Sequence, residues 1–284
     1  MKNIKKSLCL MLSLLMVFAS LNIFSITAEA STYNTEQQMI RLACYCYGKL
    51  HGEKYGTTPS DDWKEIYSYD NPKTGFNCMF FKSTYEKESK HDYCIAYTGT
   101  TDLTDLKTYP SIALAIQNLQ LDDAVEQFNF LIDQYKDDIN KVYITGHSLG
   151  AYLASYVESE IVDENITSIS KDKTACYAFG DPGFSNKGIN NWARIKINNN
   201  KNGKYDNYIY EYKNDFDPVA NINQLASVWK VNITFTQIGT VTNLDHHAII
   251  AIPMSKCKSK FLAVPIIAIN MLSHMPNVYV EGLA

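Results

Sequence analysis

The sequence predicts an α/β fold in which a central, mostly parallel sheet is flanked by helices. Three short runs, 142–145, 175–179 and 208–212, are rich in the β-branched and aromatic residues that favour strands. Segments 122–135 and 149–161 carry apolar residues at helical spacing. Strands that alternate with helices along the chain are typical of a parallel sheet with helices on its faces.

The first 30 residues have the pattern of a secretory signal peptide. Three lysines precede the apolar stretch 8–24, and Ala28-Glu29-Ala30 is a cleavage site of small residues. We therefore expect an exported protein that is cleaved after Ala30. The remaining residues, 31–284, contain no repeat or Pro/Gly/Ser-rich linker and are predicted to form a single domain.

The net charge restricts the class of partner. The whole chain has a formal charge of −4, and removing the signal peptide takes away three lysines and one glutamate, which leaves −6. So acidic a chain argues against nucleic acid as a partner, because the phosphate backbone attracts basic surfaces. The sequence contains no signal of an oligomeric state.

The first elements of the mature chain are expected to be a helix, two strands and a second helix. Segment 35–50 has helical spacing, and the polar, Asp-rich stretch after it is interpreted as a loop. Runs 76–85 and 93–97 are predicted strands joined by a charged turn, which indicates a hairpin. The strongly amphipathic segment 122–135 is then predicted to be the helix before the central strand.

The most informative stretch is Gly146-His147-Ser148-Leu149-Gly150. This GxSxG pattern lies where a strand-like run gives way to helical spacing from Leu149 onward. A sharp strand-to-helix turn exposes the serine hydroxyl, and glycine on either side removes side chains that would collide there. The N–H groups of the helix start can stabilise an oxyanion. The pattern predicts a nucleophile elbow, with Ser148 as the nucleophile of a serine hydrolase.

The elements after the elbow helix are expected to be strands separated by polar loops. Strand 175–179 ends at Gly180-Asp181-Pro182-Gly183, and the Asn-rich stretch 190–207 is interpreted as a loop. The alternating run 208–212 is a predicted strand, and a further pair of strands is expected at about 228–239.

A serine hydroxyl needs a base to take its proton and an acid to orient that base. In α/β-hydrolases these partners follow the nucleophile in the order acid, then histidine. Asp217, which follows an alternating strand, is the preferred acid, and Asp215 is the near alternative. Only His246, His247 and His274 occur late enough to be the base.

No metal or other cofactor is predicted. The three adjacent residues Asp245-His246-His247 cannot readily converge on one ion, and the sequence shows no further ligand cluster. Six cysteines remain after cleavage, which permits disulfides in an exported chain, although buried thiols are an equal alternative. Cys78 and Cys94, in two runs expected to be neighbouring strands, are the most plausible pair.

Four motifs together resemble the class 3 lipase family. They are Tyr97-Thr98-Gly99-Thr100 followed by Asp105-Leu106, the elbow with its flanks at 142–154, Asp217-Pro218-Val219, and a late histidine. The resemblance extends from about Phe76 to Ile250. It implies an α/β-hydrolase-type fold and hydrolysis of carboxylic esters, commonly acylglycerols, with some feruloyl esterases and phospholipases among the members.

The resemblance also implies the roles of the catalytic residues. Ser148 would be the nucleophile and Asp217 the acid. His247 is preferred as the base because a small and then an apolar residue follow it, as is usual in the family, and His246 is the alternative.

The oxyanion hole implied by the resemblance consists of Thr100 and the amide of Leu149. Two positions depart from the family pattern: Thr98 stands where Arg is frequent, and Ala151 where a third Gly is common. The lid of such lipases would fall within 101–121, which contains no obvious amphipathic cap. Its apolar residues are expected to line an acyl site or to belong to the core.

The sequence therefore predicts a secreted, metal-independent serine ester hydrolase, a lipase or carboxylesterase that works through an acyl-enzyme. The expected substrate is an acylglycerol or another lipid or aryl ester, with transient contact to a lipid interface. The alternatives are a feruloyl or acetyl esterase, a phospholipase, and a secreted binding protein that keeps the fold without turnover.

Overall fold

The structure is a computed structural model, and it describes residues 34–51, 59–99, 119–187, 191–228, 232–244 and 276–283. The predicted signal peptide at 1–30 lies outside these ranges. Within them, no helix has both the length and the apolar character needed to cross a bilayer.

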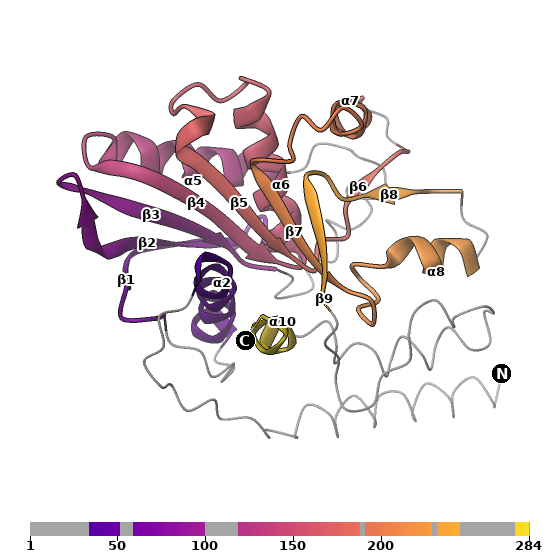
Figure 1. Cartoon of the computed structure of the whole chain (residues 1–284), viewed down its shortest axis with the longest axis horizontal. Helices are drawn as coiled ribbons and strands as arrows, with labels where there is room; N and C mark the ends of the chain where they lie inside the picture. The colour runs from indigo at the N-terminus through magenta and orange to yellow at the C-terminus, as the bar shows by residue number, and fades with distance from the viewer. Residues whose placement is uncertain are drawn as a thin grey trace.

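A seven-stranded sheet forms the centre of the molecule, in the order β1-β2-β3-β4-β5-β7-β9 (Figure 1). The pairs β1·β2 and β2·β3 are antiparallel, and each later pair in this order is parallel. The prediction of a mostly parallel central sheet is thus confirmed. The strands are β1 (Trp63–Asn71), β2 (Phe76–Lys87), β3 (Lys90–Tyr97), β4 (Ile139–His147), β5 (Thr174–Phe179), β7 (Ile209–Asn214) and β9 (Thr240–Leu244).

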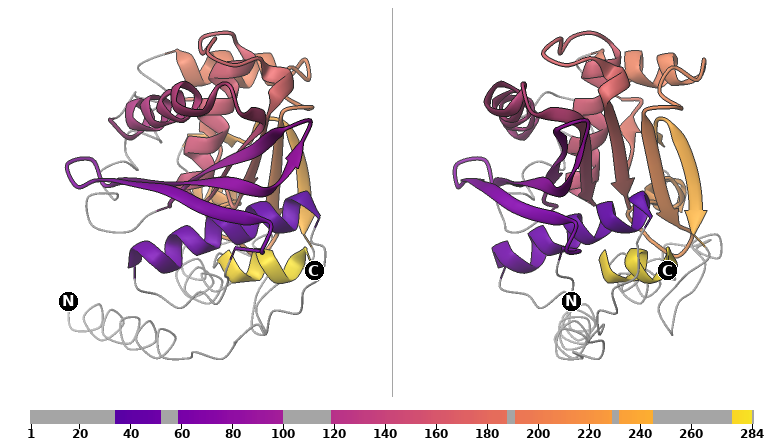
Figure 2. Two further views of the ribbon diagram at one scale, coloured as in Figure 1. Left: turned by 90° about the vertical axis from the view of Figure 1, so that its left-hand side faces the viewer. Right: turned by 60° about the vertical axis from the view of Figure 1, so that its left-hand side comes forward.

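Helices cover both faces of this sheet and give a three-layered arrangement (Figures 1 and 2). On one face, α5 (Leu119–Tyr135) and α6 (Leu149–Val162) enclose an apolar core that includes Phe80, Tyr97 and Phe128. On the other face, α2 (Thr35–His51) and α10 (Pro276–Gly282) lie side by side over a second core. The side-chain amide of Gln37 at the start of α2 donates to the carbonyl of Leu283, just after α10.

Cys78 and Cys94 are not paired, which corrects the disulfide expectation. The two residues do lie on adjacent antiparallel strands, but Cys78 is opposite Tyr97 and Cys94 is opposite Phe81. This offset of three positions sends the two side chains to opposite faces of the sheet, because side chains alternate along a strand. Each thiol is buried in a different core, and burial raises the pKa of both well above the ordinary range.

Three elements differ from the sequence prediction. The first is β1, which lies in the stretch expected to be a loop and pairs antiparallel with β2 as an edge strand. The second is α7 (Trp192–Asn200), in the Asn-rich stretch also expected to be a loop. There the Trp192 ring packs edge-on against Tyr156, and Lys196 is ion-paired with Glu160 and Asp163. The third is the C-terminal helix α10, for which no element was predicted.

The region 228–239 also differs from the predicted strand pair. Helix α8 (Ile222–Val228) comes first, and the short β8 (Phe235–Thr236) pairs with β6 (Phe184–Ser185), not with a neighbouring strand. The strand that joins the main sheet is β9, which runs parallel to β7 with Leu244 beside Asn214. A 3-10 turn, η1 (Lys171–Lys173), leads into β5.

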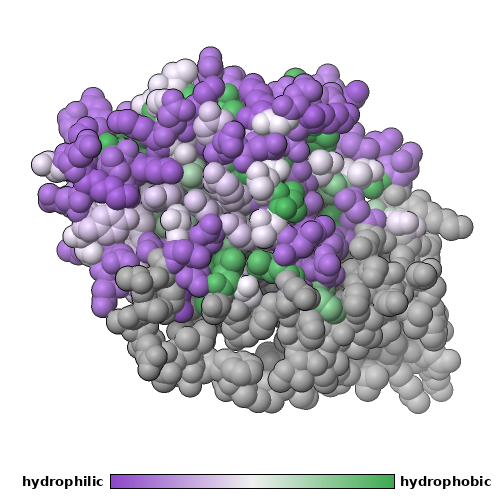
Figure 3. All heavy atoms as spheres, in the orientation of Figure 1, coloured by the Kyte–Doolittle hydropathy of each residue, from purple (hydrophilic) through white to green (hydrophobic). Residues whose placement is uncertain are grey.

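The face shown in Figure 3 is largely hydrophilic. Among the described residues, the large exposed hydrophobic side chains are Leu119, Phe130, Ile195 and Val241, which are spread over α5, α7 and β9. Isolated exposed apolar residues of this kind are normal for a protein surface.

Candidate active site

Ser148 occupies the turn between β4 and α6. Its backbone has φ 58° and ψ −123°, in the positive-φ region that residues other than glycine rarely adopt. The Ser148 N–H donates a hydrogen bond of 2.9 Å to the carbonyl of Phe179 at the end of β5. The sheet therefore holds the strained turn in place, as strain at a functional residue requires.

The two glycines of the pentapeptide are needed because backbone segments meet at the elbow. A Cβ atom added to Gly146 would lie 2.3 Å from the carbonyl carbon and oxygen of Gly150. One added to Gly150 would lie 2.2 Å from the carbonyl oxygen of Tyr97, at the end of β3. These contacts are far inside van der Waals range and involve backbone atoms, so a side chain would force the strand ends apart.

The end of β3 lies directly beside the elbow. Tyr97 pairs with Gly146 in parallel register, so the chain leaving β3 passes the start of α6. Thr98 is fixed there by two hydrogen bonds of 3.1 Å, from its N–H and its hydroxyl, to the carbonyl of Asn77. Leu149 is the first residue of α6, where N–H groups have no acceptor within the helix. Thr100, the other predicted oxyanion donor, lies outside the described residues, as does most of the lid segment 101–121.

Asp217 follows β7 and is fully buried, whereas Asp215 is exposed. The Asp217 Oδ1 atom accepts hydrogen bonds from the N–H groups of Val219 (2.7 Å) and Ala220 (3.1 Å). The Asn221 side chain donates to the carbonyls of both Asn214 and Asp217, at 2.8 Å each. The loop is thus folded tightly around the Asp217 carboxylate.

The topology brings these residues to one edge of the sheet. Strands β4, β5, β7 and β9 are parallel, so their carboxyl ends lie along the same edge. Ser148 directly follows β4, and Asp217 comes three residues after the end of β7. His246, His247 and His274 lie outside the described residues, although β9 ends at Leu244 on this same edge.

A buried acidic pair behind the elbow was not foreseen from the sequence. The Ser155 hydroxyl of α6 lies 2.9 Å from Asp181 Oδ2 and 3.1 Å from Glu211 Oε1. Burial raises the pKa of Asp181, and burial together with the Asp181 charge raises that of Glu211 well above the ordinary range. The pair therefore keeps a proton to higher pH than exposed carboxyl groups do. The side-chain amide of Gln237 donates to the carbonyls of Asp181 and Ala220, at 2.9 Å each, which connects this pair to the Asp217 loop.

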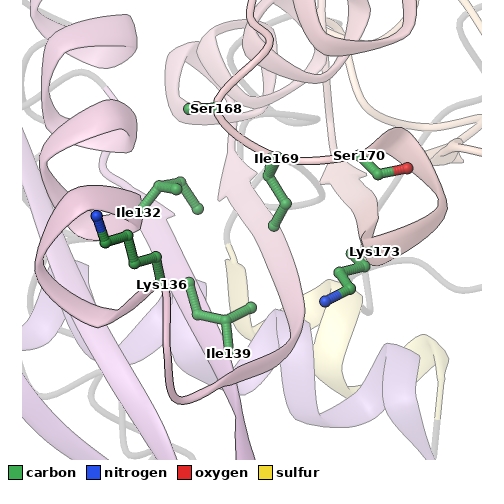
Figure 4. Close-up of a pocket in the computed structure, with 7 residues that line it drawn as sticks. All are labelled: Ile132, Lys136, Ile139, Ser168, Ile169, Ser170 and Lys173. Carbon is green, nitrogen blue, oxygen red and sulfur yellow. The ribbon is translucent and has the colours of Figure 1, made fainter.

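A shallow pocket of about 250 Å³ lies at the opposite end of the sheet. Figure 4 shows its isoleucine side chains around one hollow. It contains Ile139, the first residue of β4, whereas the elbow follows the last residue of that strand. Eight steps of about 3.3 Å separate the two ends by roughly 26 Å, so this pocket is distinct from the candidate active site. Its lining residues are Ile132, Lys136, Ile139, Ser168, Ile169, Ser170 and Lys173.

Comparison with known proteins gives a family match. The family model described as Lipase (class 3) matches residues 72–226, more than half of the chain. Comparison with curated protein sequences gives no match.

Two solved structures share the fold over nearly their whole length. The lipase from Rhizopus microsporus var. chinensis is 15% identical, with a TM-score of 0.51 over 88% of this chain and 92% of that one. The M37 lipase is 14% identical, with a TM-score of 0.51 over 89% of this chain and all of that one. These neighbours confirm the α/β-hydrolase-type fold expected from the elbow and its flanks.

Proposed function

Because this chain belongs to the class 3 lipase family, we propose that it hydrolyses carboxylic esters through a covalent acyl-enzyme. One observation carries the proposal: Ser148 in its strained turn and the buried Asp217 follow parallel strands of one sheet at the same edge. A nucleophile and an acid on loops at one edge are what a Ser-His-Asp triad requires.

His247 is the proposed base, with His246 as the alternative. It comes three residues after Leu244, which pairs with Asn214 immediately before the Asp217 loop. Three residues of extended chain span at most about 11 Å, so this histidine follows closely on the strand end that lies beside the Asp217 loop. Position in the chain, acid before histidine, also follows the order of α/β-hydrolases.

In the first half of the reaction, the Ser148 Oγ atom attacks the ester carbonyl carbon while His247 takes the hydroxyl proton. The Leu149 N–H and Thr100 stabilise the tetrahedral oxyanion, and Asp217 orients the imidazole and stabilises its positive charge. The intermediate collapses with cleavage of the bond between acyl carbon and alkoxy oxygen. The alcohol leaves with the proton from His247, and the acyl group remains on Ser148.

In the second half, water attacks the acyl carbon and gives its proton to His247. The oxyanion forms in the same place and is stabilised by the same donors. Its collapse breaks the bond to Ser148 Oγ, which regains its proton, and releases the carboxylic acid. No step of this scheme uses a metal or another cofactor.

The proposed setting is outside the cell, because the pattern of residues 1–30 predicts export and cleavage after Ala30. The proposed substrates are acylglycerols or other lipid or aryl esters, reached through transient contact with a lipid interface. Family membership supports an ester of this class.

The decisive test is Ser148→Ala. It is expected to lower hydrolysis of p-nitrophenyl butyrate by a factor on the order of 10⁴ or more, with nearly unchanged thermal unfolding. A fluorophosphonate probe should label Ser148 in the wild type, and His247→Ala should abolish labelling while His246→Ala retains it. Wild-type activity in Ser148→Ala would refute the mechanism, and absence of labelling in the wild type would favour a binding protein without turnover.

The substrate class is tested by a panel of esters. Acylglycerols of increasing chain length, acetyl and feruloyl esters, and phospholipids separate a lipase from the esterase and phospholipase alternatives. A kcat/KM highest for acylglycerols is the expected result.

A further inference from the structure

The C-terminal helix α10 places one tyrosine against both parts of the candidate site. Tyr279 is fully buried, and its ring packs edge-on against His147 of the elbow, with centroids 5.6 Å apart. The same ring lies 6.4 Å from Phe179, whose carbonyl accepts the Ser148 N–H. Helix α10 begins 50 residues beyond the segment matched by the family model, so this contact belongs to a part of the chain which that match does not cover.

The Tyr279 hydroxyl donates a hydrogen bond of 2.5 Å to Asp217 Oδ2. A carboxylate has about four acceptor positions. The N–H groups of Val219 and Ala220 take two of them on Oδ1, and Tyr279 takes a third on Oδ2. These three donors together fix the plane in which Asp217 presents its charge.

We propose that Tyr279 is a positioning residue for the triad: its hydroxyl fixes the carboxylate of Asp217, and its ring supports His147 at the elbow. The inference rests on the proposed function, because Asp217 has to act on a base for its orientation to matter. It assigns to the C-terminal helix a role in the chemistry besides covering the second core.

The effect of this contact on the base can be derived from its charge. A donated hydrogen bond withdraws negative charge from the carboxylate, so Asp217 stabilises an imidazolium less strongly than it would without it. Removing the donor should raise the pH at which the base loses its proton. Among the residues that the structure describes, the titratable groups that act on or contact the tyrosine are Asp217, His147 and, more weakly, Glu211. Burial, followed by the Asp217 charge, raises the pKa of Tyr279 well above its ordinary range, so it stays a donor at working pH.

The test compares Tyr279→Phe with Tyr177→Phe in the full mature chain. Tyr279→Phe removes only the hydroxyl and keeps the ring against His147. Tyr177 lies in the same core on β5 and makes stacking contacts with Tyr210 and Tyr212, so Tyr177→Phe is the matched control. Active sites are counted by fluorophosphonate titration, and kcat/KM for p-nitrophenyl butyrate is measured from about pH 5 to about pH 9.

We expect Tyr279→Phe to lower kcat per titrated site about tenfold with little change in KM, as for loss of a hydrogen bond to a charged group. The midpoint of the acidic limb of its kcat/KM profile should rise by about half a pH unit or more. The Tyr177→Phe profile should keep the wild-type midpoint. If Tyr279→Phe has the wild-type kcat per titrated site and the wild-type midpoint of the pH profile, the inference is overturned. This holds even when fewer sites are titrated, because such a result shows a purely structural role. Absence of ester hydrolysis and of labelling in the wild type overturns the proposed function itself, and this inference with it.

Discussion

Replacing Glu158 by Gln is expected to stabilise the protein at alkaline pH and to change it little at about pH 5. Glu158 lies on the elbow helix α6 and is fully buried. Its Oε1 atom accepts a hydrogen bond of 2.8 Å from the Thr174 hydroxyl, and its Oε2 atom has no hydrogen-bond partner among the residues that the structure describes. Burial raises the pKa of Glu158 to about 8, and the Thr174 bond and the charge of Lys141 only partly oppose this. The folded protein therefore holds Glu158 as a neutral acid.

The magnitude follows from the proton that the folded state keeps. The ordinary pKa of this group is 4.5, so between that pH and about 8 the unfolded chain has lost a proton that the native protein retains. In this window the free energy of unfolding falls by about 1.4 kcal/mol for each pH unit. The contribution of the Glu158 proton to the free energy of unfolding is fully present below the ordinary pKa of this group and is lost as the pH rises to about 8. From pH 5 to pH 8 the loss is about 4 kcal/mol, a large part of a typical domain stability.

Urea unfolding followed by tryptophan fluorescence at about pH 5, 6.5 and 8 measures this effect. Gln keeps an acceptor for Thr174 and cannot ionise, so the difference in stability between Glu158→Gln and wild type should grow by about 4 kcal/mol over this range. Other buried acids, such as Asp181 and Glu211, titrate in both proteins and cancel in the difference. Glu126→Gln, on the exposed side of α5, makes the same substitution at a carboxyl that is not buried and is the control. A Glu158→Gln difference that stays constant from pH 5 to pH 8 would refute the reasoning.

Two further predictions concern packing. Gly150→Ala should lower the free energy of unfolding by about 2 kcal/mol or more and abolish ester hydrolysis, because the new methyl group would collide with the Tyr97 carbonyl. Thermal unfolding and the p-nitrophenyl butyrate assay measure the two effects. A variant that unfolds at the wild-type temperature would contradict the close approach. Cys78 and Cys94 are expected to be free thiols, because they face opposite sides of the sheet. Both should therefore be alkylated when the protein is unfolded without reductant, which mass spectrometry detects. Recovery of a disulfide-linked peptide that contains both cysteines would show the register to be wrong.

The elements that the sequence predicted best are those whose signal is local. The elbow strand β4 and helix α6 follow from one apolar run, two glycines and a helical repeat, all within about 20 residues of Ser148. Polar segments were mispredicted where distant contacts override a weak local pattern. Helix α7 is an example, because Trp192 and Lys196 contact Tyr156 and Glu160 on α6, each 36 residues earlier in the chain.

Several features of the candidate site likewise have no local signal in the sequence. Asp217 and Asp215 are two residues apart with similar surroundings in sequence, yet the fold buries one and exposes the other. The contact between Tyr279 and Asp217 spans 62 residues and has no local signal. The same holds for the raised pKa values of Asp181 and Glu211, because the burial that mainly causes them is created by folding.

The sequence by itself determined the family, the order of strands and helices around Ser148 and the position of the candidate nucleophile, because these depend on residue spacing along a single stretch of backbone. Only the tertiary structure decided which acid is buried, which faces of the sheet carry the two cysteines, and that the C-terminal helix supports the candidate site. Each of these depends on packing between segments far apart in the chain, where burial and strand register set the environment of a side chain.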